Sequence, residues 1–335
     1  MIDEEKKNKA IAFILLIVTA LIWGGTWPMG RFLVAEKVGG VVIPPLMLAV
    51  IRYFLAVICF FIILKLREGS LNFQFAKKYW KIMAFMGLTS VTIYQSGYLI
   101  GEIFTAASDA SIMVATNAVW VIILSSIFLK TESFSWKKFI GTLLAFFSVV
   151  IVVGFSPNVD VANRILGDIF VLVAAFAYAV YSVTSRYFMN KTKLVENKND
   201  YQPSSLWIIT WVSFFGFVIT TPIAFIFSPQ YLNPVIYFNI PISIWLGISY
   251  LAFLSTVGAY TFYLEGIKRL DASRAAIFQT LVPLFGVVLS AIFLQEKFDF
   301  LIYPLSLLLV ISGIILVNYN SSKKKFKEKN EDQKN

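Results

Sequence analysis

Long apolar runs separated by short polar segments dominate the chain. Ten of these runs have roughly the 20 residues that an α-helix needs to cross the hydrocarbon core of a bilayer. The pattern therefore predicts an all-α integral membrane protein with ten transmembrane helices. The predicted helices cover residues 10–33, 45–66, 82–101, 105–129, 139–155, 167–189, 206–227, 242–264, 272–294 and 301–318.

Most basic residues lie in alternate connections between these runs. If the N-terminus is inside, 24 of the 29 Lys and Arg residues fall in cytoplasmic segments and 3 in outer ones. An excess of Lys and Arg marks the cytoplasmic side of membrane proteins. We therefore predict that both termini are cytoplasmic. Only Arg31 and Arg52 fall within the predicted helices.

The two halves of the chain are similar in sequence. At an offset of 165 residues, 12 of the 32 positions from Tyr98 onward are identical, and a weaker match at offset 155 joins the first and sixth helices. Because each half has five helices, the second half enters the membrane with opposite polarity, as in many transporters. We predict two inverted five-helix repeats, residues 10–155 and 167–319. A cytoplasmic N-terminus (1–9), an outer linker (156–166) and a cytoplasmic basic tail (320–335) complete the chain.

The composition excludes several classes of protein. The chain is 58% hydrophobic and 14% charged, whereas a soluble domain is about 25% charged, so a soluble enzyme is excluded. The absence of His and the single Cys exclude a His-ligated metal site, a His general base and an internal disulfide. We expect no metal and no cofactor. The net charge of +10 reflects the loops and does not indicate nucleic-acid binding.

Several motifs resemble those of the drug/metabolite transporter superfamily, EamA-like branch. They are Trp23–Trp27, Arg52–Phe54, Thr105–Ser111 with its counterpart Leu270–Ala276, and Ser290–Glu296 after Pro283. The resemblance covers nearly the whole chain and implies a ten-helix plasma-membrane carrier, often an exporter of amino acids or related compounds. One departure is Asn117-Ala118, where the family often has Asn-Pro.

Two residues stand out as candidates for substrate binding. Arg52 lies about seven residues inside the second predicted helix, where a charge costs ~2.5–3.5 kcal/mol and must face protein or water. It either binds a substrate carboxylate or phosphate, pairs with helix C-terminal carbonyl groups, or extends its guanidinium toward the membrane surface. Trp23 precedes Gly24 and Gly25, which allow close packing or local unwinding, so it is expected to line a cavity. Trp27 is expected at the membrane interface.

Uncharged polar and aromatic residues recur near the middle of other predicted helices. Inside the membrane such groups need hydrogen-bond partners, which are either one another or a substrate. Together they indicate a polar, aromatic-lined cavity that suits amino acids, bases or amphipathic organic molecules. The candidate substrate-binding residues are Trp23, Arg52, Tyr94, Gln95, Asn117, Trp120, Tyr178, Tyr181, Tyr250 and Gln279.

Three acidic residues bear on proton coupling. Glu102 and Asp109 are predicted near the outer surface, and Glu265 near the inner end of the eighth helix, where Lys268 and Arg269 favour a surface ion pair. A buried carboxylate can bind a proton and couple transport to a proton gradient. The sequence leaves proton coupling, exchange and facilitated diffusion open.

We therefore expect a secondary carrier that moves small metabolites by alternating access, with the lipid bilayer and a small solute as partners and a homodimer as an open alternative. A non-transporting membrane sensor and a lipid-modifying membrane enzyme are the competing hypotheses. The lack of His and of a sizeable soluble domain argues against both.

The predicted topology can be tested by cysteine labelling. A membrane-impermeant reagent should label a cysteine at Asn158 from outside and a cysteine at Asn197 only from inside, because these positions lie in segments with few and with many basic residues. The reverse labelling pattern would refute the orientation.

Overall fold

The computed structural model describes residues 2–36, 42–129, 136–156, 161–195, 201–269, 278–279, 281–313 and 315–316. Within these ranges the regular secondary structure is helical and contains no strand. The all-α prediction is therefore confirmed for this part of the chain. The tail 320–335, the motif 270–276 and the labelling positions Asn158 and Asn197 lie outside it.

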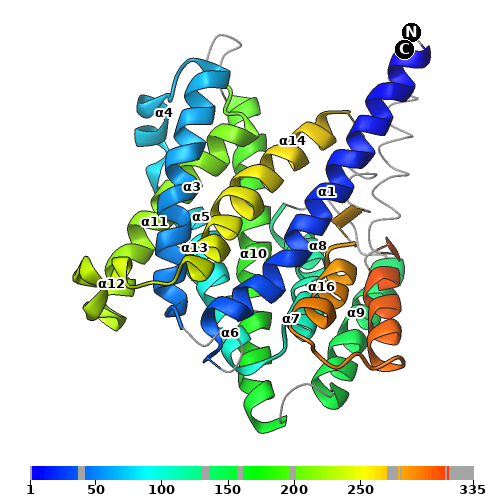
Figure 1. Ribbon diagram of the computed structural model, residues 1–335. Helices are drawn as coiled ribbons and strands as arrows, with labels where there is room; N and C mark the ends of the chain where they lie inside the picture. The colour runs from blue at the N-terminus through cyan, green and yellow to red at the C-terminus, as the bar shows by residue number, and fades with distance from the viewer. Residues whose placement is uncertain are drawn as a thin grey trace.

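The helices follow the predicted apolar runs, with interruptions in some of them (Figure 1). The first half contains α1 (Ile2–Val34), α3 (Pro45–Glu68), α4 (Phe73–Lys78), α5 (Trp80–Gly87), the π-helix η1 (Leu88–Ile93), α6 (Tyr94–Phe104), α7 (Ala107–Val114), α8 (Asn117–Leu124), the π-helix η2 (Ser125–Leu129) and α9 (Trp136–Phe155). The second half contains α10 (Val161–Val195), α11 (Ser205–Phe227), the 3-10 helix η3 (Pro229–Leu232), α12 (Val235–Phe238), α13 (Ile242–Ser249), the π-helix η4 (Tyr250–Gly258), α14 (Ala259–Arg269), α16 (Leu281–Phe293) and a last helix over Ile302–Gly313.

Five helices in the described ranges are long and apolar enough to cross a membrane. They cover Ala10–Val34, Pro45–Glu68, Arg164–Thr192, Ser205–Phe227 and Ile242–Gly266, and shorter apolar helices cover Leu143–Val152, Leu281–Phe293 and Ile302–Gly313. The third predicted helix is instead built from α5, η1 and α6 in succession, and the fourth is broken by a turn at Ala115 and Thr116. These interruptions divide two apolar runs that the sequence pattern predicts as single helices.

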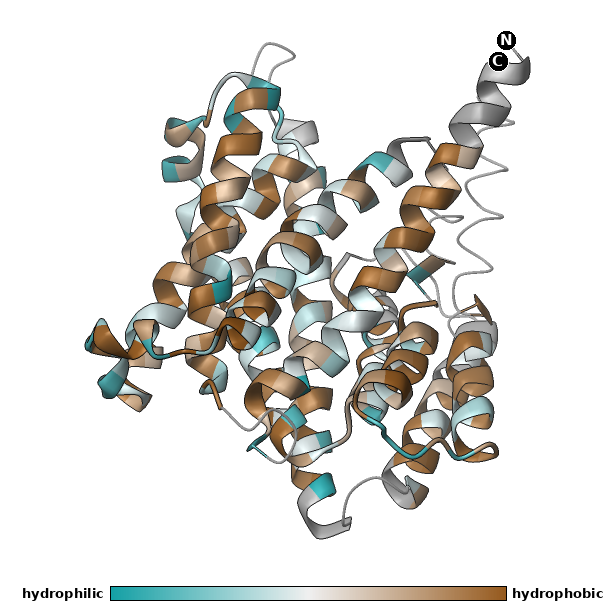
Figure 2. Cartoon of the chain, in the orientation of Figure 1, coloured by the Kyte–Doolittle hydropathy of each residue, from teal (hydrophilic) through white to brown (hydrophobic). Residues whose placement is uncertain are grey.

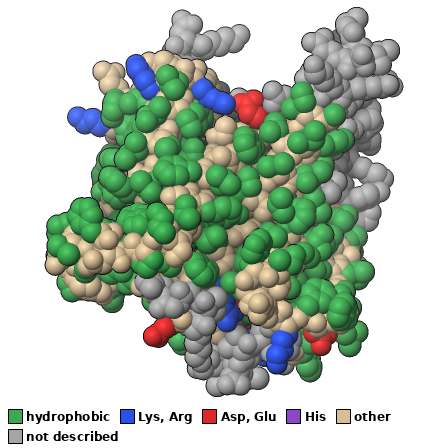
Figure 3. All heavy atoms as spheres, in the orientation of Figure 1, with side chains coloured by type: hydrophobic (Ala, Val, Ile, Leu, Met, Phe, Trp, Pro, Cys, Tyr) green, Lys and Arg blue, Asp and Glu red, His purple; other side chains and the backbone are tan. Residues whose placement is uncertain are grey.

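The outer surface carries the apolar side chains expected of a membrane protein. Apolar segments cover most of the length of the long helices (Figure 2). On the face shown in Figure 3, hydrophobic side chains fill a broad central band, and the visible charged side chains gather at its upper and lower margins. Phe54 and Ile62 of α3 and Leu246 of α13 are more than half exposed. Such a band is the surface that lipid tails cover.

Close helix packing depends on glycines at several crossings. α10 packs along α6, α11 packs along α3 and α5, and α1 packs along both α14 and α16. A Cβ atom at Gly87 of α5 would lie 2.5 Å from the backbone nitrogen of Gly216 in α11, and one at Gly101 would lie 2.8 Å from the carbonyl oxygen of Gly167. Small residues allow such backbone contacts where no hydrophobic force drives helices together. Gly87 and Gly101 therefore permit the close approach of these helices.

Replacing Gly87 with Ala should destabilise the protein by about 1–3 kcal/mol, because the new methyl group forces α5 and α11 apart. Thermal unfolding in detergent measures the effect. Leu246→Ala, which changes a side chain that is 65% exposed, is the control and should unfold at nearly the native temperature. Equal stability of the Gly87→Ala variant and the native chain would contradict the tight contact.

Candidate substrate site

Arg52 lies inside the helix bundle and is only 3% exposed. Its Nε donates a hydrogen bond to Thr256 Oγ1 (2.8 Å) and its Nη2 to Ser255 Oγ (3.3 Å). Its Nη1 donates to Gln95 Oε1 (3.0 Å) and to the Tyr98 hydroxyl (2.8 Å). We call these five residues, together with Tyr53, the cage. Tyr53 belongs to it because its hydroxyl accepts a hydrogen bond from Gln95 Nε2 (2.9 Å).

The cage holds a positive charge with neutral partners. Its members come from α3, α6 and the π-helix η4, and every hydrogen-bond acceptor of Arg52 named above is an amide or hydroxyl oxygen. A guanidinium has five N–H donors in a fixed plane and matches a carboxylate or phosphate best. The hydrogen bonds of the cage keep the buried cation solvated, but they leave its charge without a neutralising anion. Arg52 is therefore chemically suited to bind an anionic group.

The π-helix η4 supplies two of the acceptors. Thr256 accepts from Arg52 while its own hydroxyl donates to the carbonyl oxygen of Leu251 (2.8 Å), five residues earlier. The Ser255 hydroxyl also pairs with Thr26 Oγ1 (2.6 Å). π-Helical turns occur frequently at functional sites, since they re-aim side chains and free carbonyl groups. Here the widened turn presents two successive hydroxyl groups to one guanidinium.

Tyrosine rings extend from the cage toward α10. The Tyr94 ring lies 5.6 Å from that of Tyr98 and 4.8 Å from that of Tyr178, measured between centroids. Tyr178 in turn lies 5.5 Å from Tyr181. These rings offer apolar faces with polar hydroxyl tips. The predicted residues Arg52, Tyr94, Gln95, Tyr178 and Tyr181 thus form one connected group.

Helix α1 closes another side of this group. The indole N–H of Trp23 donates to the carbonyl oxygen of Ser255 (3.1 Å), and its ring packs on Tyr260 at 5.3 Å. A Cβ atom at Gly25 would lie 2.3 Å from the Tyr250 hydroxyl, which donates to the carbonyl oxygen of Ile22 (2.7 Å). α1 is helical throughout Ile2–Val34. The glycines therefore serve close packing, and the alternative of local unwinding does not apply.

The prediction that Trp27 lies at the membrane interface is wrong. Its side chain is 4% exposed and packs edge-on against Tyr98 at a centroid distance of 5.3 Å. A Cβ atom at Gly286 would lie 3.0 Å from Trp27 Cδ1. The close crossing of α1 and α16 at Gly286 buries the indole, which the helical period alone does not reveal.

Three predicted residues lie apart from the cage. Asn117 is the first residue of α8 and is half-buried. Trp120 is 37% exposed and packs on Phe176 of α10. Gln279 is exposed and lines a narrow recess together with Trp23. The structure therefore divides the predicted residues into three groups. Most of them belong to the cage or pack beside it, Asn117 and Trp120 lie together on α8, and Gln279 lies beside Trp23 of α1.

Sequence reasoning missed four members of the cage. They are Tyr53, Tyr98, Ser255 and Thr256. Tyr98 lies three residues after Gln95 and hence on the same face of α6, and Tyr53 adjoins Arg52. Their spacing from predicted site residues could therefore have indicated both of them. Ser255 and Thr256 lie about 200 residues from Arg52 in the π-helix η4, so no local pattern connects them to it.

A second network connects the ends of α1, α6, α7 and α16, and we call it the seal. It consists of Arg31, Thr105, Ala107, Ser108 and Glu296. Arg31 Nη1 pairs with Glu296 Oε1 (3.0 Å) and also donates to the carbonyl oxygen of Thr105 (2.7 Å). The Glu296 carboxylate accepts the backbone N–H groups of Ala107 (2.9 Å) and Ser108 (3.0 Å) and the Ser108 hydroxyl (2.6 Å). A carboxylate at a helix N-terminus satisfies unpaired N–H groups and the helix dipole.

The acidic residues differ from their sequence-based placement. Glu102 and Asp109, expected near the surface, are each 0% exposed because α1, α10 and the Ile302–Gly313 helix pack around the ends of α6 and α7. Glu265 forms its ion pair with Arg67 of α3 (2.7 Å), a residue far away in sequence.

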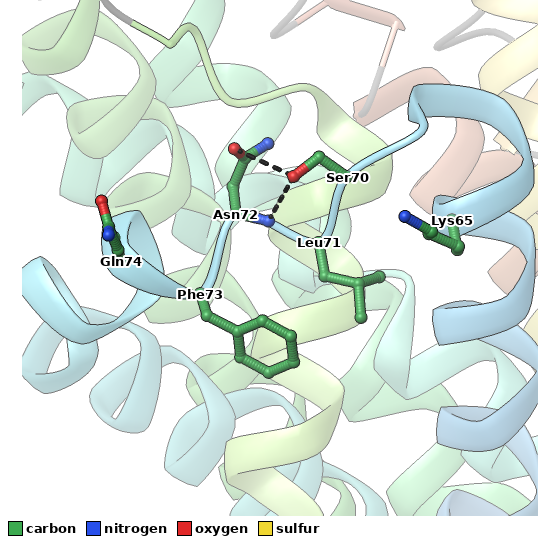
Figure 4. A pocket seen from close by; sticks show the side chains of 6 residues that line it. All are labelled: Lys65, Ser70, Leu71, Asn72, Phe73 and Gln74. Carbon is green, nitrogen blue, oxygen red and sulfur yellow. Dashed lines mark hydrogen bonds between the residues drawn. The ribbon is translucent and has the colours of Figure 1, made fainter.

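A separate hollow, which has no cage residue in its lining, is shown in Figure 4. It has a volume of about 460 Å³ and sits in the turn between α3 and α4, where Ser70 donates a hydrogen bond to Asn72. The residues that line the hollow are Lys65, Ser70, Leu71, Asn72, Phe73 and Gln74.

Within the described residues, no group of three or more His, Cys, Asp or Glu side chains is arranged to hold a metal ion.

Thr256→Val should destabilise the protein by about 1–3 kcal/mol, because the buried Nε–H of Arg52 loses its acceptor. Thr261→Val is the matched control. The Thr261 hydroxyl donates to the carbonyl oxygen of Val257 on the same helical stretch, and its loss should cost about 1 kcal/mol or less. Chemical or thermal unfolding in detergent compares the two variants, and a larger loss for Thr261→Val would contradict the cage.

Comparisons with known proteins identify the family. The model of the EamA-like transporter family matches residues 10–154 and again residues 165–319. The chain is 25% identical over 280 residues to the uncharacterized transporter YyaM of Bacillus subtilis (strain 168), covering 83% of this chain and 84% of the relative.

Another relative carries a more specific description. The chain is 24% identical over 307 residues to a probable amino-acid metabolite efflux pump of Escherichia coli (strain K12), covering 90% and 93% of the two chains. A chain of known crystal structure has the same fold, with a TM-score of 0.59, 15% identity and coverage of 95% and 98%. The resemblance found in the sequence motifs is thereby confirmed, and the chain belongs to the EamA-like transporter family of integral membrane proteins.

Proposed function

We propose that this membrane transporter is a secondary carrier that exports small metabolites, such as amino acids or related organic solutes, by alternating access. It works in the plasma membrane with both termini in the cytoplasm. The observation that carries the proposal is the cage, a buried guanidinium with neutral partners drawn from both halves of the chain. A binding site between two halves is the arrangement that alternating access requires.

Helix packing supports two inverted five-helix repeats. α6 packs along α10, and its counterpart α14 packs along α1. The pairs α3 with α11 and α7 with α16 each join equivalent helices of the two halves. The sequence offset of 165 residues places Leu88–Ile93 on residues 253–258, so the π-helix η1 falls within the π-helix η4. This correspondence favours ten transmembrane helices in two related halves.

The chemistry of the cage supports an amino-acid-like cargo. Arg52 suits the carboxylate common to amino acids. The neighbouring rings of Tyr94, Tyr98 and Tyr178 offer faces for an apolar or cationic cargo group. A relative described as a probable amino-acid metabolite efflux pump is consistent with this class.

Arg52→Ala and Trp23→Ala should abolish transport while the protein still inserts into the membrane, since both side chains line the proposed cargo site. The measurement is uptake and efflux in reconstituted vesicles with amino acids, nucleosides, sugars and cationic drugs. Arg67→Ala and Trp80→Ala change exposed residues of the same types, and these controls should transport at near-native rates. Normal transport by both site variants would refute the site, and no transport of any compound by the native chain would refute the function.

A further inference from the structure

Glu102 is a fully buried carboxyl group without a hydrogen-bond partner. It lies near the end of α6 with 0% exposure, and neither carboxylate oxygen has a partner in the described part of the chain. A Cβ atom at Gly30 of α1 would lie 2.3 Å from Glu102 Oε2, so the carboxyl group fits tightly against the α1 backbone. An ionised carboxylate that is buried and unpaired is very costly. This packing therefore accommodates a neutral carboxylic acid better than a carboxylate.

The surrounding charges leave the carboxyl group uncompensated. The cation Arg31 is instead engaged by Glu296 and by the carbonyl oxygen of Thr105. The charged or titratable groups that act on Glu102 are Arg31 of α1, Arg52 of α3, Tyr98 of α6 and Glu296 of the seal.

Glu102 lies between the seal and the cage. It is one helical turn beyond Tyr98, which binds Arg52, and residues four apart share a helix face. Three residues later, Thr105 accepts a hydrogen bond from Arg31 of the seal. The last turn of α6 thus connects the two networks, and opening either one brings water to the same carboxyl group from a different side.

Two other buried acids differ from Glu102. One oxygen of Asp109 accepts a hydrogen bond from the Tyr303 hydroxyl (3.0 Å), and one oxygen of Asp168 accepts from Thr105 Oγ1 (2.6 Å). Each of these carboxyl groups therefore has a donor in place. Glu102 has none, and its neutral form is the one that this conformation accommodates.

We propose that Glu102 is the proton-binding site of the carrier. The carboxylate takes up one proton to become a neutral carboxylic acid when the seal closes, and it returns that proton to water on the other side when the cage side opens. No other bond changes. Because the seal lies on the predicted outer side, protons move inward as cargo moves out. This inference rests on the proposed function, which it extends by naming the driving ion.

Infrared spectroscopy tests the proton site without any transport assay. The full-length protein in lipid nanodiscs at neutral pH should show a carboxylic-acid C=O stretching band in the native chain. Glu102→Gln should lose part of this band. Asp299→Asn should retain it, because Asp299 is at the surface and accepts the N–H groups of Leu301 and Ile302.

A second variant keeps the infrared experiment decisive if the first one fails to fold. If Glu102→Gln does not fold, Glu102→Leu is the second variant, since a neutral unpartnered carboxyl group tolerates an apolar side chain of similar size. Spectra in which the Glu102 variants retain the full native band would show that Glu102 is ionised and would overturn the proposal.

Reconstituted vesicles test the coupling. With radiolabelled neutral amino acids as the probe, one proton per cargo predicts about tenfold accumulation per unit of pH gradient. The Glu102→Gln variant should lose this accumulation but keep exchange of labelled for unlabelled cargo at equal pH. Native-like accumulation in Glu102→Gln would overturn the proposal. Absence of exchange in the native chain would refute the proposed function for this cargo instead, and the infrared result would still decide the proton site.

Discussion

The buried guanidinium of Arg52 is the interaction on which the rest of the structure depends. A charge inside the membrane costs about 2.5–3.5 kcal/mol on insertion scales, and that cost is reduced only if dipoles surround the charge. Here α6 and the π-helix η4 bring four acceptor groups to this one side chain of α3. Because two acceptors come from the second half of the chain, solvation of this cation ties the two halves together.

Helix α1 links the cage to the seal. Its Trp23 and Thr26 contact Ser255 of the cage, and one to two turns later Gly30 and Arg31 contact Glu102 and Glu296. The seal satisfies the first N–H groups of α7 through a carboxylate from the segment after α16. Parting these helices would cost several charge-assisted hydrogen bonds. A displacement of α1 would therefore alter both networks, which gives a physical route by which the two sides of the molecule are coupled.

The sequence pattern predicts the helical class and marks Arg52 as an isolated charge within a helix, because apolar runs and single charges are local features, and the motifs indicate the family. It did not predict the π-helices, and so the two hydroxyl groups of Ser255 and Thr256 that bind Arg52 were missed. A π-turn adds one residue and rotates the side chains that follow. The burial of Trp27 likewise depends on which helix crosses α1, a property of the packed bundle. Trp120 was a reasonable candidate by residue type and depth, yet it packs on Phe176, away from the cage.

The central claim is that Arg52 binds the anionic group of the cargo. The most direct measurement is calorimetric binding of an amino acid and of its carboxamide analogue, which keeps the amino group but lacks the carboxylate, to the purified chain in nanodiscs, repeated with Arg52→Lys. A charge-assisted hydrogen bond contributes about 1.5–3 kcal/mol, so the amino acid should bind the native chain at least about tenfold more tightly than the amide. That preference should fall in Arg52→Lys, which cannot form a planar bidentate pair. Equal affinities of the native chain for the two compounds, or an unchanged preference in Arg52→Lys, would contradict the account.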